Sequence, residues 1–154
     1  MPKIKKSSRE KTKKKTVKEK DEILLGIDYG ESRIGVAFGR KGLVAPIRIV
    51  SGKNVTTAMS EISRIALEHK VTKIVFGLPL NVEGKETPQS LEVRKFANLL
   101  KVRLKKPVEF IDEYRTSKDA VKSMIGLGFS RAVRRNHDHF SAAIILKDYF
   151  SENS

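Results

Sequence analysis

The sequence predicts an α/β domain built on a mixed five-stranded sheet with helices on both faces. Three short apolar stretches with turn residues between them follow one another over residues 23–50. From residue 54 on, apolar positions recur with helical spacing, and these stretches alternate with two more short apolar strands. Strands joined by tight turns pair antiparallel, whereas strands separated by helices pair parallel, so the sheet is expected to be mixed.

The expected strands cover residues 23–27, 34–38, 43–50, 71–76 and 108–111. Residues 29–32 form the first turn, and Pro46 marks the third strand as an edge strand, because proline cannot donate to a ladder of hydrogen bonds. The first strand is the most continuously apolar. It is therefore expected to lie in the centre of the sheet and to pair with the fourth strand.

Four helices are expected between and after these strands. Asn54 is the N-cap of a helix over residues 54–70, and Thr87 caps a second helix in which Pro88 is the first helical residue. A capping box at residues 116–119 predicts a third helix to about residue 127, followed by a basic loop over residues 129–136. The last helix begins at Asp138.

Length and composition exclude several classes of protein. The 154 residues suit one ordinary domain, and no apolar run approaches the roughly 20 residues that span a bilayer. The lysine-rich N-terminus lacks the apolar segment of a secretory signal. Cysteine is absent, which excludes disulfides, cysteine nucleophiles and thiolate metal sites. We therefore expect a cytoplasmic protein with no membrane partner.

The net charge of +14 predicts a polyanionic partner, most commonly nucleic acid. Residues 1–20 hold ten Lys/Arg and two Glu, and the rest of the chain holds 22 basic and 16 acidic residues. We expect a mobile basic arm over residues 1–21 and a folded domain over residues 22–151. The alternatives are a solvated basic surface that serves solubility and an arm that is a variable extension without a role.

Carboxylates are expected at the carboxyl edge of the sheet, where ligands of α/β proteins gather. Asp28 follows the first strand, Asp112 and Glu113 follow the fifth, and Asp138 opens the last helix. Such carboxylates would repel one another without cations, and their oxygen atoms suit Mg²⁺ or Mn²⁺. On a basic protein this pattern favours metal-assisted phosphodiester hydrolysis by two ions roughly 4 Å apart.

Each of these residues also has an ordinary structural interpretation. Asp28 could hydrogen-bond its own turn, and Asp138 could be only an N-cap. Strand alternation places Asp112 and Glu113 on opposite faces, so one of the two is not expected to be a ligand. His137 and His139 flank Asp138 and are candidate ligands or bases, although exposed loop histidines are more often passive.

A set of motifs resembles the YqgF family of RNase H-like nucleases, also called RuvX. The resemblance covers about residues 24–150 and leaves out the basic arm. In chain order the motifs are Gly26-Ile27-Asp28-Tyr29-Gly30 with Arg33-Ile34-Gly35-Val36-Ala37, Gly77-Leu78-Pro79-Leu80-Asn81 with Gly84, Arg94-Lys95-Phe96-Ala97, Asp112-Glu113, and Asp138 with Ser141-Ala142-Ala143 and Ile145-Leu146. Each motif is weak by itself, but the ordered set is specific.

The resemblance implies an RNase H-like fold and an endonuclease that processes the 5′ end of pre-16S ribosomal RNA. It implies that Asp28, Glu113 and Asp138 are catalytic and hold Mg²⁺ or Mn²⁺. It also implies that residues 77–86 shape a nucleic-acid groove with Asn81 near the substrate. The chain departs from the family at Tyr114, where arginine is usual, and before Asp138, where lysine is frequent.

We expect a monomer or weak homodimer that acts on structured RNA. Five arginines are candidates for contacts with backbone phosphates, which would position the strand without reading its sequence: Arg33, Arg115, Arg131, Arg134 and Arg135. The alternatives are a Holliday junction resolvase, which would need a two-fold dimer, and a nucleic-acid-binding module without catalysis. A kinase-like nucleotide-binding relative of the same fold is disfavoured, because the chain is too short for two closing domains.

Overall fold

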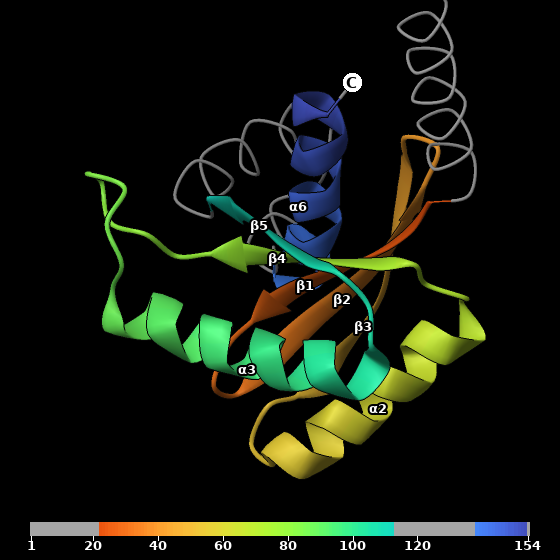
Figure 1. Cartoon of the computed structure of the whole chain (residues 1–154), viewed down its shortest axis with the longest axis horizontal. Coiled ribbons are helices and arrows are strands. Elements are labelled where there is room, and N and C mark those ends of the chain that lie inside the picture. The colour runs from red at the N-terminus through yellow and green to blue at the C-terminus, as the bar shows by residue number, and fades with distance from the viewer. Residues whose placement is uncertain (1–21, 113–137, 154) are drawn as a thin grey trace, which may run out of the picture.

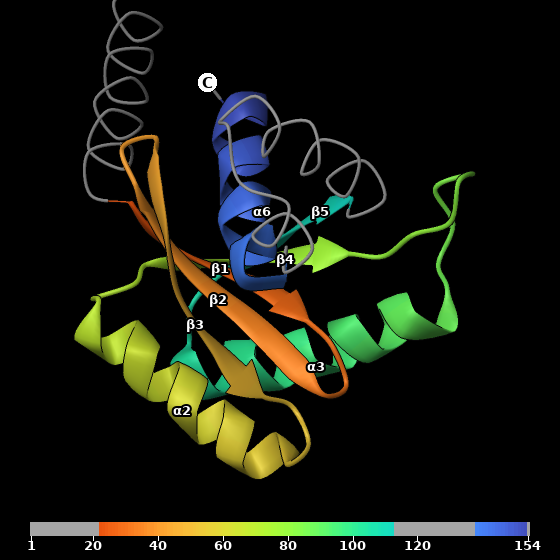
Figure 2. The same ribbon diagram turned by 180° about the vertical axis from the view of Figure 1, so that it is seen from behind.

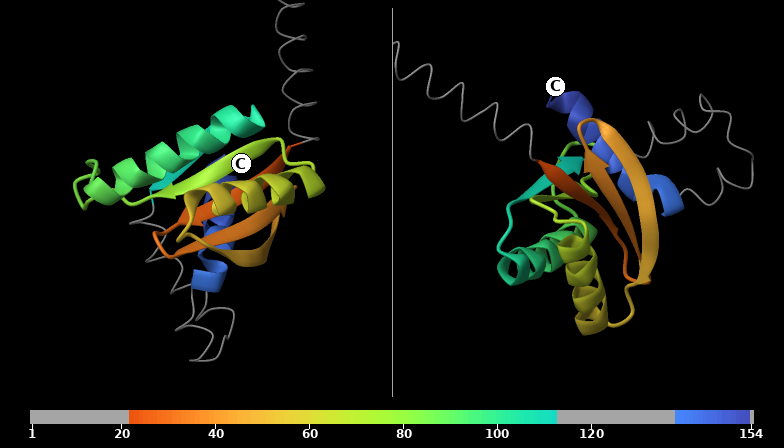
Figure 3. Two further views of the ribbon diagram at one scale, coloured as in Figure 1. Left: turned by 90° about the horizontal axis from the view of Figure 1, so that it is seen from below. Right: turned by 90° about the vertical axis from the view of Figure 1, so that its right-hand side faces the viewer.

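The computed structural model describes residues 22–112 and 138–153. The predicted basic arm, the predicted helix over residues 116–127 and the basic loop over residues 129–136 lie outside the described residues. In the described part, a central sheet is covered by helices α2 and α3 on one face and by helix α6 on the other (Figure 1). The view from behind shows α6 crossing the other face of the sheet (Figure 2), and two further views agree (Figure 3).

The five strands confirm the predicted mixed sheet. They are β1 (Ile23–Tyr29), β2 (Arg33–Arg40), β3 (Leu43–Ser51), β4 (Lys73–Leu78) and β5 (Val108–Asp112). Their order across the sheet is β3-β2-β1-β4-β5. The strand β1 pairs antiparallel with β2 and parallel with β4, and β4 pairs parallel with β5. The first strand is therefore central, as its apolar sequence predicts.

All five strands differ in extent from the sequence prediction, and two of the differences have a clear physical reason. Strand β1 continues through Asp28 and Tyr29, because both residues pair with β2, so Asp28 lies inside the strand and not after it. Strand β4 begins at Lys73 instead of residue 71. The Val71 N–H donates to the Ala66 carbonyl and thereby belongs to the end of the preceding helix, a bond that apolar spacing cannot reveal.

The N-caps of helices α2 and α3 are those that the sequence predicts. Helix α2 spans Val55–Glu68, and the Asn54 side chain accepts a hydrogen bond from the Thr57 N–H. Helix α3 spans Pro88–Leu104, with Thr87 and Ser90 forming a reciprocal capping box. Helix α6 spans Asp138–Glu152. In the described part of the chain, none of the helices has the length and hydropathy needed to cross a bilayer.

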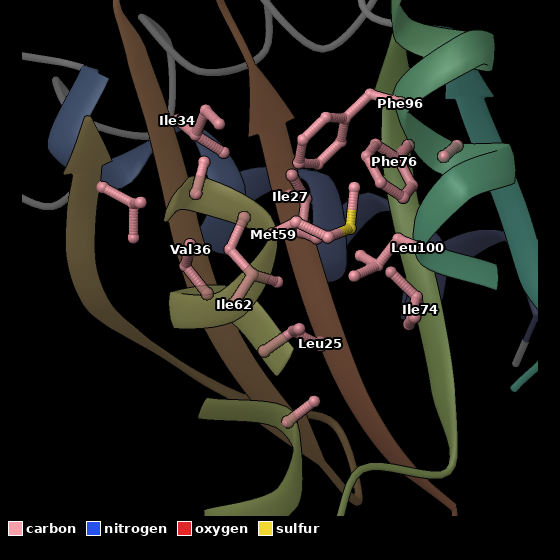
Figure 4. Close-up of a cluster of buried hydrophobic side chains, with 14 of the residues drawn as sticks. Leu25, Ile27, Ile34, Val36, Met59, Ile62, Ile74, Phe76, Phe96 and Leu100 are labelled. Atoms are coloured by element: carbon pink, nitrogen blue, oxygen red, sulfur yellow. The ribbon is translucent and has the colours of Figure 1, made fainter. Parts of the chain in front are cut away.

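The core consists of two layers of side chains, one on each face of the sheet. Between the sheet and helices α2 and α3 lies the larger layer, part of which is drawn in Figure 4; its fully buried members include Leu25, Ile27, Ile62, Phe76 and Leu100. The smaller layer lies between the sheet and α6. Burial on both faces explains why the central strands are almost continuously apolar.

Helix α6 rests directly on the backbone of β1 at Gly26. A β-carbon at this position would lie 2.5 Å from Leu146 Cγ and 2.7 Å from the Ala142 carbonyl oxygen. Both distances are shorter than van der Waals contact, so only glycine lets the helix approach this closely. At Gly39, one strand away, the equivalent neighbours are the side-chain ends of Phe150 and Leu146 at 3.0 and 3.1 Å.

Replacing Gly26 with valine is expected to force α6 away from the sheet. Overpacking of this kind costs about 1–3 kcal/mol of the free energy of unfolding. The matched control is Gly39→Val, where the neighbouring atoms are flexible side-chain ends that can shift, so the loss of free energy of unfolding should be smaller. Urea titration of the three proteins measures the difference. Equal losses at Gly26 and Gly39 would contradict the close contact.

Lys73 links four elements at the end of the sheet where β1 and β4 begin. Its Nζ lies 2.6 Å from Glu22 Oε1 and 3.5 Å from Glu109 Oε2, and it donates to the Tyr149 hydroxyl at 2.9 Å. Burial disfavours the charged amine, but the hydrogen bonds with Glu22 and Tyr149 outweigh this effect and raise the pKa of Lys73 above its usual value. This cluster stabilises the fold at the end opposite to Asp28.

Replacement of Lys73 by methionine should lower the free energy of unfolding by about 1–2 kcal/mol at neutral pH. Because the folded-state pKa of Lys73 is raised, its contribution is complete below the ordinary pKa of 10.5 and is lost as the pH rises above that value. The stability gap between the two proteins should therefore be constant from pH 7 to pH 9 and shrink in stronger base. Chemical denaturation at a series of pH values tests this, and a gap independent of pH throughout would refute it.

Candidate active site at the carboxyl edge of the sheet

Asp28 lies at the edge of the sheet where the parallel strands β4 and β5 also end. Ile27 of β1 is level with Phe76 of β4, and Phe76 is level with Phe110 of β5. Asp28 therefore lies one residue further toward the edge that Asp112 closes. Carboxyl edges of this kind are where α/β proteins bind ligands.

Strand alternation places Asp28 on the face of the sheet that α6 covers. Leu25 and Ile27 belong to the core layer under α2 and α3, whereas Leu24 belongs to the layer under α6. Gly26 touches α6. Because alternate residues share a face, the Asp28 side chain follows Gly26 on the α6 side. Asp28 is partly buried there.

The direction of α6 brings its first turn to the same edge. Ala142 and Leu146 contact Gly26, whereas Phe150 contacts Gly39, which pairs with Leu24. The helix thus runs away from Asp28 as the chain proceeds from residue 142 to residue 150. Its first residue, Asp138, precedes Ala142 by about one turn and so belongs to the end of the helix nearer to Asp28.

Asp112 lies on the other face of the sheet. Ile111 belongs to the layer under α6, whereas Phe110 packs against the layer under α2 and α3. By alternation Asp112 shares the face of Phe110, and it is partly buried. The sequence left open whether Asp112 or Glu113 is the ligand, and this register separates Asp112 from Asp28.

A hollow of about 360 Å³ opens beside Asp28. Its lining consists of Asp28, Tyr29, Gly30, Ser32, Arg33, Gly35, Ile49 and Gln89. Gly35 pairs with Asp28 on one side and with Ile49 on the other, so a residue without a side chain separates the two. The predicted phosphate contact Arg33 lies in this lining at the start of β2 and is exposed.

The turn after Asp28 is fixed by close backbone packing. The Gly52 N–H donates to the Ser32 carbonyl at 2.9 Å. A β-carbon on Gly52 would lie 2.7 Å from the Gly30 carbonyl oxygen, so the two backbone segments touch. These backbone contacts hold the turn next to Asp28 in place.

Tyr29 and Gln89 are lining residues that the sequence did not single out. The Tyr29 ring lies 4.6 Å from the Phe96 ring between their centroids, which holds it against the core. Burial raises the pKa of the Tyr29 hydroxyl, and the charges of Glu92 and Glu31 add to the effect. The hydroxyl is therefore protonated at neutral pH and can donate a hydrogen bond. Gln89 reaches the hollow only through the docking of α3, which leaves no local sequence signal.

Asn81 organises the loop between β4 and α3. Its side-chain oxygen accepts hydrogen bonds from the N–H groups of Glu83 and Lys85, both at 2.9 Å. Its backbone N–H donates to the Lys85 carbonyl, and its carbonyl accepts from Gly84, which has a φ of +78°. The predicted substrate residue Asn81 therefore has a structural role in this loop through its oxygen atom.

Glu86 attaches this loop to α3. The Arg94 guanidinium donates to both oxygens of the Glu86 carboxylate, at 2.6 and 3.1 Å. These bonds lower the pKa of Glu86. The Thr87 hydroxyl donates to the Pro79 carbonyl at 2.7 Å and closes the base of the loop.

Most other predicted site residues lie outside the described part of the chain. These are Glu113, Arg115, Arg131, Arg134, Arg135 and His137. For Asp138 and His139 the structure describes the helical backbone but not the side chains. Among the described side chains, no three of the His, Cys, Asp or Glu type lie close enough together to hold a metal ion.

The family model described as "RuvX: Holliday junction resolvase" matches residues 22–152. The chain is 37% identical over 132 residues to a protein of Chloroflexus aurantiacus, covering 84% of this chain and 86% of that protein. It is 34% identical over 132 residues to a protein of Escherichia coli O1:K1, covering 84% and 96%. Both relatives carry the name "Putative pre-16S rRNA nuclease".

Solved structures of low sequence identity share the fold. The RuvC protein of T. thermophilus, in a structure with a Holliday junction substrate, superposes with a TM-score of 0.59 at 12% identity, covering 86% of this chain and 97% of that chain. The Holliday junction resolvase of fowlpox virus gives a TM-score of 0.52 at 12% identity, covering 86% and 99%. These likenesses confirm the predicted RNase H-like arrangement of the sheet and helices. The family match over residues 22–152 and the relatives at 37% and 34% identity show that this chain is a member of the RuvX family.

Proposed function

We propose that this chain is a metal-dependent endonuclease that hydrolyses phosphodiester bonds in structured RNA, with the 5′ end of pre-16S ribosomal RNA as its substrate. One observation carries the proposal: Asp28 lies at the carboxyl edge on the face of α6, whose first turn belongs to the same edge. The names of the relatives and the charge of +14 support a nuclease that acts on RNA.

The donor set fits a hard divalent cation. Asp28 offers carboxylate oxygens beside a partly open hollow, and carboxylates are the usual protein ligands of Mg²⁺ and Mn²⁺. We assign the remaining ligands to Glu113 and Asp138, both acidic residues of the family motifs. When bound, such ions lower the pKa of an attacking water and stabilise the leaving oxygen.

The residues of the hollow bind and orient the substrate. Arg33 is placed to contact a phosphate beside Asp28, and the protonated Tyr29 hydroxyl can donate a hydrogen bond to a sugar or phosphate oxygen. Further phosphate contacts are proposed for Arg115, Arg131, Arg134 and Arg135, with sequence-independent affinity added by the basic arm. We propose a cytoplasmic monomer or weak homodimer.

The description of the family model favours a second candidate, the resolution of four-way DNA junctions. Resolution requires two symmetric cuts and therefore a two-fold dimer on the junction. Light scattering on the complex with a junction tests this requirement, since a strict monomer cannot make paired cuts. An RNA nuclease needs one active site only.

Asp28→Asn should abolish cleavage of a pre-16S ribosomal RNA fragment while the protein still binds it. The amide keeps the size of the side chain but removes the charge that holds a cation. Mutation of residues that only hydrogen-bond to metal ligands already lowers metal affinity or activity by about 10–100-fold, so the loss at a direct ligand is expected to be about a hundredfold or more. Cleavage is followed by gel analysis in Mg²⁺ or Mn²⁺, and binding by fluorescence anisotropy in EDTA.

The matched control for this variant is Glu31→Gln. Glu31 is an exposed carboxylate three residues away, in the turn that follows β1, and is not part of the hollow lining. Both substitutions remove one negative charge, so a general electrostatic effect would appear in both. Cleavage by Asp28→Asn at the wild-type rate, or wild-type cleavage in EDTA, would disprove the metal-nuclease function.

Asn81→Asp separates the two roles of Asn81. A carboxylate still accepts from the N–H groups of Glu83 and Lys85, but it lacks the amide donor and repels phosphate. In this variant the Lys85 backbone N–H should stay protected from hydrogen exchange, and the stability should be that of the wild type. If the side-chain amide of Asn81 contacts RNA, the variant should bind RNA about five- to tenfold more weakly. Asn81→Ala should lose the amide protection as well. Wild-type affinity in Asn81→Asp would restrict Asn81 to its structural role.

A further inference from the structure

A second cavity lies between helix α3 and strand β5, away from the hollow at Asp28. Its volume is about 200 Å³, and its lining consists of Arg94, Ala97, Asn98, Lys101, Val108 and Phe110. Apolar groups and a ring thus form part of its wall, while an amide and two cationic side chains form the rest. None of these residues lines the hollow at Asp28.

Arg94 and Phe110 lie against each other in the wall of the cavity and together form a platform. The Arg94 Cζ atom lies 4.9 Å from the centroid of the Phe110 ring. Two hydrogen bonds to the Glu86 carboxylate fix the edge of the guanidinium, so its plane is held in one orientation. The Phe110 ring in turn packs against the Phe76 ring, with 6.1 Å between their centroids.

The Glu86 carboxylate already neutralises Arg94, which argues against a phosphate as the ligand at this point. A guanidinium whose edge is occupied still offers its plane, and arginine planes and aromatic rings are the surfaces on which unpaired bases stack. Asn98 supplies donor and acceptor groups at the wall, and the Lys101 amine supplies a charge for the backbone of the same nucleotide.

The helix that forms one wall of the cavity carries mostly basic exposed side chains. The exposed charged side chains of α3 and the turn after it are Glu92, Arg94, Lys95, Lys101, Arg103, Lys105 and Lys106, of which only the first is acidic. Gln89, at the start of the same helix, lines the hollow at Asp28. Helix α3 therefore contributes to both cavities. Arg94 follows Gln89 by five residues, which corresponds to about 7.5 Å along the helix axis.

We propose that this cavity binds one unpaired base of single-stranded RNA, which stacks on the Arg94–Phe110 platform. The inference rests on the proposed function, since the base would belong to the RNA that is cut at Asp28. It assigns specificity to Arg94 and Phe110: the enzyme would prefer cleavage sites with an unpaired nucleotide at a fixed distance from the cut.

The test compares two fluorescent probes in EDTA, where no cleavage takes place. One is a short single-stranded oligoadenylate RNA, and the other has the same backbone with abasic residues. The measured quantity is the dissociation constant of the abasic probe divided by that of oligoadenylate. This ratio isolates the contribution of the bases, because phosphate contacts are common to both probes. The wild-type protein should bind oligoadenylate about fivefold or more tightly than the abasic probe.

Arg94→Lys and Phe110→Leu should both lower this ratio toward one. Lysine keeps the charge without the plane, and leucine keeps apolar volume without the ring. The control is Arg64→Lys on α2, where an exposed arginine pairs with Glu68 and does not line the cavity, and it should leave the ratio unchanged. Thermal melting verifies folding, and if Phe110→Leu does not fold, Arg94→Lys decides alone.

Glu86→Gln distinguishes stacking from phosphate binding at Arg94. Stacking on a fixed plane predicts a lower ratio, because the plane loses its charged partner. A phosphate site predicts tighter binding of the abasic probe with an unchanged ratio, which would overturn the proposal. An unchanged ratio in Arg94→Lys would also overturn it.

The outcomes separate this inference from the proposed function. If Asp28-dependent cleavage is present and the ratio does not respond to Arg94→Lys, the base site is refuted and the nuclease stands. If no RNA is cut in any metal but the ratio falls in Arg94→Lys, the nuclease is refuted and the base site stands.

Discussion

The contact between α6 and β1 at Gly26 is the constraint on which the candidate site depends. A β-carbon here would overlap the Ala142 carbonyl oxygen and Leu146 Cγ, so the helix can lie on the strand only because the strand offers bare backbone. The contact fixes the height and direction of α6. It thereby brings the first turn of that helix to the edge of the sheet at which Asp28 lies.

The two ends of the sheet have different electrostatics. At one end Lys73 is paired with Glu22 and Glu109 and hydrogen-bonded to Tyr149, which leaves its charge compensated. At the other end Asp28 lies beside an open hollow with the exposed Arg33. The Lys73 amine already has its partners, whereas carboxylate oxygens beside open space can bind a divalent cation. The chemistry is therefore expected at the Asp28 end.

The loop between β4 and α3 illustrates how family motifs combine structure with function. Asn81 holds the loop through its side-chain oxygen, and Glu86 attaches the loop to Arg94. Arg94 in turn lies on the Phe110 ring. A motif residue such as Asn81, which the sequence predicts to lie near the substrate, thus also builds the loop on which the substrate would lie.

The sequence by itself determined the mixed sheet and the caps at Asn54 and Thr87, and it made Asp28 a candidate site residue, because these depend on local patterns of apolar spacing, turn chemistry and charge. It could not determine that β1 continues through Asp28 and Tyr29, since pairing with β2 decides where the strand ends. Nor could it separate Asp112 from Asp28 or bring Gln89 to the hollow. Those placements depend on strand register and on the docking of α3, which arise from contacts between residues far apart in the chain.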